Sequence, residues 1–215
     1  MDLGKMIRDF RKRTGDLVRP YAWPDEDLAE YFTDAEKEAS IRSRLIRDTD
    51  ELDISAGDTV IDLPAGLFAI EFAELRDAAG NRYEIRGTDR GDLDAHFPGW
   101  RTESNRPKNY VHDDKSLTLG YVADAAYTLY IEFYRTPKNA LVTDSDVPEI
   151  AEIHHESLAD WVEFKGYSIP DTDFLDKGRA AQAEQRFIAY FGKSPNANLR
   201  RRQNANRPHR NTLHG

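Results

Sequence analysis

Hydrophobic positions near the start of the chain recur at helical spacing. Leu3, Met6, Ile7 and Phe10 are three or four residues apart, and Gly15 marks a stop. A longer stripe of the same kind runs over residues 24–47, with acidic residues in its first turn and arginines in its last turns. The pattern therefore predicts one helix before Gly15 and a second helix over residues 24–47.

The spacing changes from helical to alternating near residue 52. Residues 52–63 contain two short alternating runs around a Gly-Asp pair, which predicts a β-hairpin. Further short runs follow, and the last, over residues 127–134, places Tyr127 and Leu129 on one face with Ile131 and Phe133. A contiguous block of about seven antiparallel strands is typical of a small β-sandwich.

Helical spacing returns after the strands. Asp146 is the predicted N-cap of a third helix that runs to Gly166, with Pro148 and Glu149 in its first turn. A fourth helix is predicted from the break at SIPD to Gly192, which suits the position just after a helix.

Each terminal pair of helices is too small to enclose a hydrophobic core by itself. We therefore expect the two pairs to pack together, with the strands inserted between the second and third helices along the chain. The predicted fold class is α+β: a four-helix bundle with an inserted antiparallel β-sandwich-like domain and an extended C-terminal arm. The predicted domains are residues 1–50 with 140–192 for the bundle, 51–139 for the β domain, and 193–215 for the arm.

Charge is distributed unevenly along the chain. Of the 30 Lys and Arg residues, six lie in residues 193–215, where no Asp or Glu occurs. The preceding 192 residues therefore carry 24 basic against 39 acidic side chains, a net charge of −15. The arm is too polar to order itself, which favours weak, salt-sensitive DNA binding or docking into an acidic groove of another protein.

The predicted docking residues of the arm are its arginines, which can pair with carboxylates in bidentate fashion, and one leucine as an apolar plug. They are Leu199, Arg200, Arg201, Arg202, Arg207 and Arg210. Fully extended, the 23 residues of the arm span roughly 75 Å, enough to cross a neighbouring subunit.

The composition of the chain argues against disulfide-bonded, secreted and membrane-spanning classes of protein. The absence of cysteine excludes disulfides and thiolate chemistry, and hydrophobic residues make up 39% of the chain. Charges interrupt the N-terminal segment, so it is not expected to be a signal peptide. No apolar run approaches 18 residues, so no membrane association is expected.

Candidate catalytic and metal-binding motifs are incomplete. HHES at 154–157 lacks a second histidine four residues after either His154 or His155. We expect His154 near the helical core and His155 near its edge. DSDVPEI lacks the glycine and glutamate of a calcium loop, and GKS at 192–194 lacks the upstream glycine of a phosphate loop. The sequence thus predicts no catalytic residue, no metal, no cofactor and no enzymatic activity.

Several segments, in order, resemble one family. MDLGKMIRDFRKRTGD followed by YAWPDEDLAEYFTDAEKEASIRSRL resembles the opening of head-to-tail adaptor (connector) proteins of tailed bacteriophages. The resemblance continues through DLPAGLFAIEFAELRDAAG and PGWRTESNRPKNY, and then through VPEIAEIHHESLADWVEFKGY to AEQRFIAYFGKS. It covers most of residues 1–193, whereas the arm resembles the family only in kind.

The resemblance implies a structural virion protein of the neck, between head and tail, that is assembled in the host cytoplasm. Copies would form a dodecameric ring beneath the portal protein, although the free chain can be monomeric. The ring would extend the channel for double-stranded DNA without binding it specifically, and would carry tail or nozzle proteins. The arm would then dock on the portal, and the acidic body would suit a channel along which DNA slides. The alternatives are a tail-completion or other neck protein, and a nucleic-acid-binding module that uses the basic arm.

Overall fold

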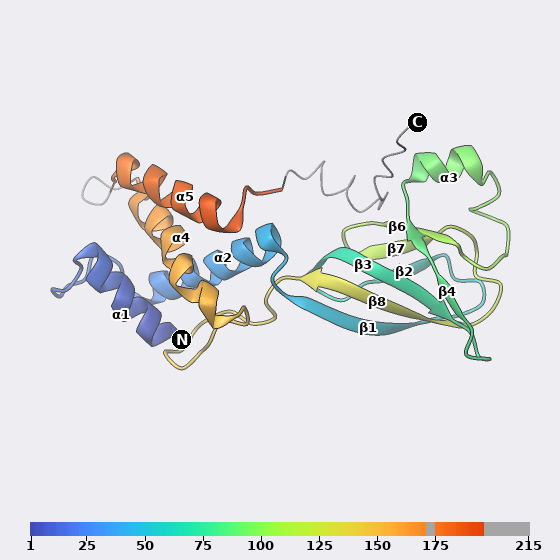
Figure 1. Ribbon diagram of the computed structural model, residues 1–215, viewed down its shortest axis with the longest axis horizontal. Helices are drawn as coiled ribbons and strands as arrows, with labels where there is room; N and C mark the ends of the chain where they lie inside the picture. The colour runs from blue at the N-terminus through green and yellow to red at the C-terminus, as the bar shows by residue number, and fades with distance from the viewer. Residues whose placement is uncertain (171–174, 196–215) are drawn as a thin grey trace, which may run out of the picture. The chain divides into compact units, whose positions relative to one another are not determined.

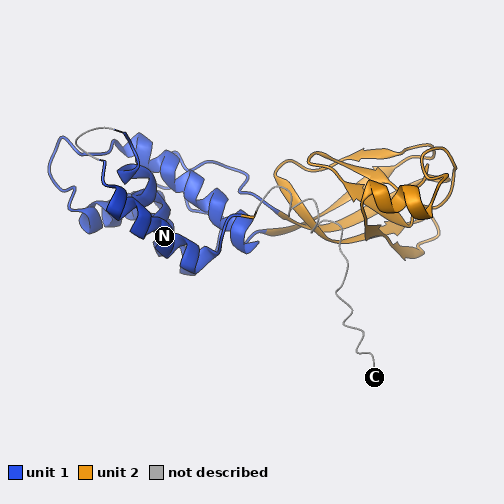
Figure 2. Ribbon diagram, turned by 90° about the horizontal axis from the view of Figure 1, so that it is seen from above, with its two compact units in different colours: residues 1–46, 135–194 blue, residues 47–134, 195–215 orange. Residues whose placement is uncertain are grey.

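The computed structural model describes residues 1–170 and 175–195. These residues form two compact units, one built by Met1–Ile46 with Arg135–Ser194 and the other by Arg47–Tyr134 (Figures 1 and 2). The helices are α1 (Leu3–Thr14), α2 (Asp25–Ser43), α3 (Arg90–His96), the 3-10 helix η1 (Glu152–His154), α4 (His155–Tyr167) and α5 (Lys177–Phe191). The strands are β1 (Arg47–Ile54), β2 (Val60–Asp62), β3 (Leu67–Arg76), β4 (Arg82–Glu84), β5 (Arg86–Gly87), β6 (Asn109–His112), β7 (Ser116–Leu119) and β8 (Tyr127–Arg135).

The first unit has one hydrophobic core, to which both ends of the chain contribute. Phe10 of α1, Phe32 of α2, Leu158 of α4 and Phe187 of α5 are all buried in it. Burying a side chain of this size stabilises a fold by about 1.5–3 kcal/mol. The mixed α+β class is therefore confirmed for the described residues. The four-helix bundle stays a prediction, because a shared core does not define a bundle without near-parallel helix axes.

The second helix is shorter than predicted. It ends at Ser43 because Arg44, at φ 51°, adopts a left-handed conformation and donates its backbone N–H to the carbonyl of Ser40. Arg47, which was expected in the last turns, instead begins β1 and lies opposite Tyr134 of β8. The prediction to residue 47 was wrong because the strand pairing, a contact between distant segments, outweighs local helical spacing.

The predicted helix start at Asp146 is also wrong. The Asp146 carboxylate accepts the backbone N–H groups of Val142 and Thr143, both at 2.8 Å, and so closes a turn within the connection to the next helix. Glu149 pairs with Arg135 rather than lying in a first helical turn. Helical backbone begins only at η1, and α4 begins at His155.

The second unit consists of two four-stranded sheets, in the orders β1-β8-β3-β4 and β2-β7-β6-β5. Leu129 and Ile131 of β8 share one buried cluster with Leu117 and Leu119 of β7, so the two sheets enclose one core as in a β-sandwich. The predicted alternation along β8 is confirmed, since its odd-numbered residues are buried. The sheets are not wholly antiparallel, because β5 pairs with β6 in parallel.

The hairpin predicted over residues 52–63 does not form. β1 belongs to the first sheet, where it pairs with β8 along its whole length, and β2 pairs with β7 in the second sheet. Gly57, at φ 95°, lies in the turn that carries the chain from one sheet to the other, and its N–H donates to the carbonyl of Ala123 at 2.8 Å. A Gly-containing turn signals a change of direction, but it does not specify which strand becomes the partner.

Candidate assembly site

The predicted docking residues of the arm, Leu199, Arg200, Arg201, Arg202, Arg207 and Arg210, lie outside the described residues. The structure does describe the segment that leads into them. We call residues 191–195 the arm root. Its surroundings define the position from which the basic arm continues.

The arm root begins on a buried aromatic side chain. Phe191 is buried against Phe187, with ring centroids 4.7 Å apart, and against Tyr190 at the same distance. Gly192 then turns the chain out of α5 at φ 85°, while its N–H still donates to the carbonyl of Ile188 at 2.9 Å. A residue with a side chain rarely adopts this conformation, so glycine allows the helix to end directly after Phe191.

The end of α2 holds the arm root. Ser43 Oγ donates a hydrogen bond to the carbonyl of Phe191 at 2.8 Å, and Arg42 Nη1 donates to the carbonyl of Gly192 at 3.3 Å. Carbonyls at a helix C-terminus lack partners within their own helix, so these side chains cap α5 from a different segment. The arm therefore continues from a fixed point on the helical unit.

Arg42 is itself held by its neighbours. Its side chain is 5% exposed, and its Nε donates to Glu38 at 3.0 Å. The guanidinium group lies over the rings of Trp161, at 4.9 Å, and Phe187, at 5.1 Å. These contacts orient the cation toward the arm root. Sequence reasoning missed both Arg42 and Ser43, because nothing in a single sequence links them to residues about 150 positions away.

A network of ion pairs joins α1, α4 and α5. Asp160 and Glu163 of α4 each contact Arg13 of α1 and Arg186 of α5, with the Arg186 contacts at 2.8 and 2.7 Å. The two carboxylates are only 12% and 13% exposed, and each meets two guanidinium groups. The charges are thereby compensated, and α1 and α5 are both tied to α4.

The two histidines occupy positions opposite to those predicted. His155 is buried, and its Nδ1 and Nε2 lie 3.1 and 2.9 Å from the carbonyl oxygens of Met1 and Ile150. His154 is only half-buried and contacts Tyr190 and Phe191 beside the arm root. His155 lies on the same face of α4 as the buried Leu158 and Val162, whereas His154 belongs to η1 before that helix.

The described residues offer no gathering of three His, Asp or Glu side chains that would hold a metal ion. Among the helices within residues 1–170 and 175–195, none is both long and apolar enough to cross a membrane.

These features define a class: a mixed α+β protein whose helical core is built by both ends of the chain, with an inserted two-sheet unit and a fixed exit for a basic C-terminal segment. The model of the SU10 adaptor protein family matches residues 1–211, and the chain therefore belongs to that family. Membership confirms the resemblance to adaptor proteins that the sequence motifs indicated.

Solved structures include a similar chain in the neck of an empty GTA particle computed with C6 symmetry. The two chains are 15% identical, and the match covers 89% of this chain and 95% of the other, with a TM-score of 0.28. A likeness of this size supports no conclusion about the present chain. No match was found among curated proteins.

Proposed function

We propose that this protein is a head-to-tail adaptor of a tailed bacteriophage. Twelve copies form a ring beneath the portal, with the helical unit, packed as the predicted four-helix bundle, as the ring body. The ring extends the DNA channel and carries tail or nozzle proteins in the neck of the virion, after assembly in the host cytoplasm. One observation carries the proposal, namely the match to an adaptor family over residues 1–211.

The arm is the proposed anchor on the portal. It carries six basic side chains and no acidic one, which suits an acidic groove, and its arginines suit bidentate pairing with carboxylates. An arm that orders only when it docks pays for that ordering in affinity. Several arms that bind one portal together offset this cost, because the binding of each raises the effective concentration of the others. The capped arm root supports this role, because a fixed starting point limits the volume that each arm must search.

The acidic body is proposed to help DNA move. Residues 1–192 carry a net charge of −15, and like charge near the phosphates lowers affinity for DNA. The role is structural, with no enzymatic activity and no cofactor. A structure of the assembled ring with mainly basic side chains along its channel would rule out this account of the charge.

Co-sedimentation with the portal ring of the same genome tests the anchor. We expect the full-length chain to pellet with the portal, and a chain that ends after Pro195 to remain in the supernatant. The truncation keeps the arm root, so its helical unit should stay intact.

A matched pair of variants separates charge from length. In one, Arg200, Arg201, Arg202, Arg207 and Arg210 become lysine, and in the other they become glutamine. Portal binding that survives in the lysine variant and is lost in the glutamine variant indicates charge-based docking. If neither the full-length chain nor the truncation binds, the adaptor proposal fails, and a shift of duplex DNA by the full-length chain alone would favour a nucleic-acid-binding module.

A further inference from the structure

The loop between α1 and α2 exposes apolar side chains at its tip. Leu17 and Val18 are 63% and 79% exposed, and Arg19 beside them is exposed and forms no ion pair within the described residues. We call residues 17–19 the knob. Two adjacent exposed aliphatic side chains form a small apolar surface, and covering it with another molecule would be favourable.

The loop is held firmly at its base, and Arg19 of the knob lies 5.3 Å from the centre of the Tyr21 ring. The buried Arg11 pairs with Asp16 and Asp25, donates to the carbonyl of Trp23 at 2.8 Å, and lies 3.7 Å from the centre of the Tyr21 ring. Asp16 in turn accepts the backbone N–H of Ala22 at 2.8 Å. Burying a charge requires this many partners, and together they hold both ends of the loop. The knob is therefore ordered before any partner binds, which lowers the entropy cost of docking.

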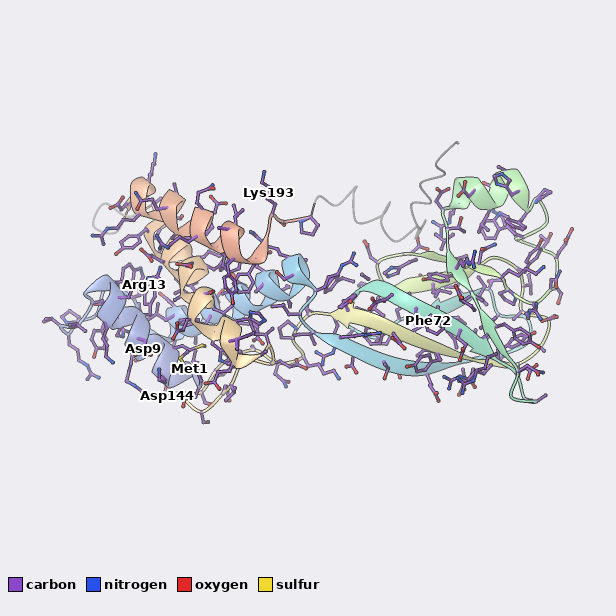
Figure 3. The ribbon with its side chains drawn as sticks, viewed as in Figure 1. Met1, Asp9, Arg13, Phe72, Asp144 and Lys193 are labelled. Atoms are coloured by element: carbon purple, nitrogen blue, oxygen red, sulfur yellow. The ribbon has the colours of Figure 1, made fainter. Side chains whose placement is uncertain are left out.

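A cavity of matching size opens between α1 and α4 on the same unit. Its volume is about 300 Å³, and Met6, Phe10, Phe32 and Ala159 form its apolar part. A cavity of about 150 Å³ already accommodates benzene, so this one can hold two aliphatic side chains. Figure 3 labels Asp9 and Arg13 on α1 and Met1 just before the helix begins, and these three residues also line the cavity.

The rim of the cavity carries a charge opposite to that of the knob. Glu156 lines the cavity, is exposed, and forms no ion pair within the described part of the chain. Arg13 on the same rim already forms ion pairs with Asp160 and Glu163. Glu156 is thus a carboxylate available to the cation of the knob.

We propose that the knob of one copy docks into the α1–α4 cavity of the next copy in the ring. Leu17 and Val18 fill the apolar part of the cavity, and Arg19 pairs with Glu156. The contact joins two different patches, so each copy gives one knob and receives another. A succession of such contacts closes into a ring when the rotation between neighbouring copies is a whole fraction of a full turn, and the symmetry of the portal would impose that rotation. The inference rests on the proposed adaptor function.

The contact is small, which has a consequence for assembly. A single knob buries too little surface to hold two free chains together, since stable interfaces bury about 1,200–2,000 Å². Copies that arms hold side by side on a portal meet at a high effective concentration, where the same contact becomes favourable. The contact therefore forms on the portal and is weak in dilute solution.

Cysteine pairs test the contact, because the chain contains no cysteine of its own. The test variant carries Val18→Cys and Ala159→Cys. A matched control carries Val147→Cys and Ala159→Cys, since Val147 is also a valine of the helical unit and is 58% exposed. The two further controls are the single variants Val18→Cys and Ala159→Cys. Each variant is bound to portal rings, oxidised and run on a denaturing gel without reductant.

The test variant should give a ladder of covalent oligomers that ends in a closed ring. The single variants and the Val147 control should give no species larger than a dimer. A ladder of equal strength in the Val147 control, or no ladder from the test variant on portal rings, would overturn the proposal.

Oxidation of the concentrated free protein separates this inference from the proposed function. If the chain does not bind the portal but the test variant still forms a ladder in concentrated solution, the contact is right and the adaptor function is wrong. If it neither binds the portal nor forms a ladder, both are wrong. Protection of the Ala159→Cys thiol from thiol reagents, combined with no ladder from the test variant, would point to a different occupant of the cavity and also overturn the proposal.

Charge reversal provides a second readout that needs no cysteine. Arg19→Glu and Glu156→Arg should each raise the protein concentration needed for half-maximal ring formation on the portal by about threefold to tenfold. The double variant should restore it, because the pair is re-formed with opposite orientation. Failure of the double variant to recover would show that Arg19 and Glu156 do not meet.

Discussion

Glu36 of α2 is 1% exposed and lies within the helical unit. Its carboxylate accepts the backbone N–H groups of Glu149 and Ile150, the latter at 3.2 Å. Burial raises the pKa of Glu36 above its ordinary value, although the two hydrogen bonds act in the opposite direction. The folded protein therefore holds a proton on this residue more readily than the unfolded chain does.

This predicts a pH dependence that Glu36→Gln removes. With a raised pKa in the folded state, the contribution of Glu36 to stability is fully present below its unfolded pKa of about 4.3. That contribution is lost as the pH rises through the folded value. We expect the wild type to lose stability relative to Glu36→Gln by on the order of 1 kcal/mol over this range. Urea unfolding from about pH 4 to about pH 8 measures the difference, and parallel curves for the two proteins would contradict it.

At the scale of elements, the contact between α2 and α5 determines where the arm starts. Ser43 and Arg42 donate to the last carbonyls of α5, and the Phe191 ring is buried below them. A helix end that is capped from another helix is protected from fraying. The order of the arm root thus depends on a contact between the second and the last helix of the chain.

Ser43→Ala should loosen this end of α5. Loss of the hydrogen bond to Phe191 removes about 1 kcal/mol of local stability, which corresponds to an about fivefold larger population of the open state and about fivefold faster hydrogen exchange. Hydrogen exchange of the Gly192 amide, which donates to Ile188, reports it directly. Ser168→Ala is the matched control, because Ser168 Oγ donates to the carbonyl of Phe164 at the end of α4, and the substitution so removes an equivalent hydrogen bond at another helix end. Equal exchange at Gly192 in all three proteins would show that Ser43 does not hold the arm root.

At the scale of the whole molecule, the inserted unit begins and ends at neighbouring positions. Arg47 at the start of β1 and Tyr134 at the end of β8 are cross-strand partners, and the N–H of Arg135 donates to the carbonyl of Ile46 at 3.1 Å. Opposite residues in an antiparallel pair have Cα atoms about 4.5–5.5 Å apart. The inserted unit therefore leaves and re-enters the helical unit at almost one point.

This arrangement predicts that the insertion can be removed. A chain that joins Ile46 to Arg135 through a short glycine-serine turn should keep the helical unit and its binding to the portal. The excised segment 47–134 should unfold cooperatively by itself, because its core draws on both of its own sheets. Circular dichroism, urea unfolding and portal co-sedimentation check the three statements. Loss of cooperative unfolding in the joined chain would show that the helical unit depends on the insertion.

Local sequence patterns predicted where helices and strands form better than they predicted which elements pair with one another. The stripe Leu3, Met6, Ile7 and Phe10 corresponds to α1, and the alternation in residues 127–134 corresponds to β8. Both signals concern which side chains must leave water, and that requirement is written in the spacing of the residues. Partner choice is not local, and for this reason the 52–63 hairpin failed and residue 47 was assigned to a helix.

The candidate site likewise has features that can be read from the sequence and features that depend on contacts between distant segments. The charge of the arm and the order of the family motifs are properties of the sequence, and they were sufficient for the family to be recognised. The capping of α5 by Ser43, the loop held by Arg11 and the cavity between α1 and α4 combine residues that lie far apart along the chain or on different helices. The exchange of roles between His154 and His155 shows that helical spacing alone does not decide which of two neighbouring side chains the packing buries.

The sequence by itself determined the α+β composition, the positions of most helices and strands, the polarity of charge between body and arm, and membership of the adaptor family. Only the tertiary structure decided which strands pair, how α2 caps the arm root, and where a knob and a cavity lie on one unit. The physical reason is that burial and charge are encoded residue by residue. Pairing and packing instead depend on which distant segments compete most favourably for the same contact.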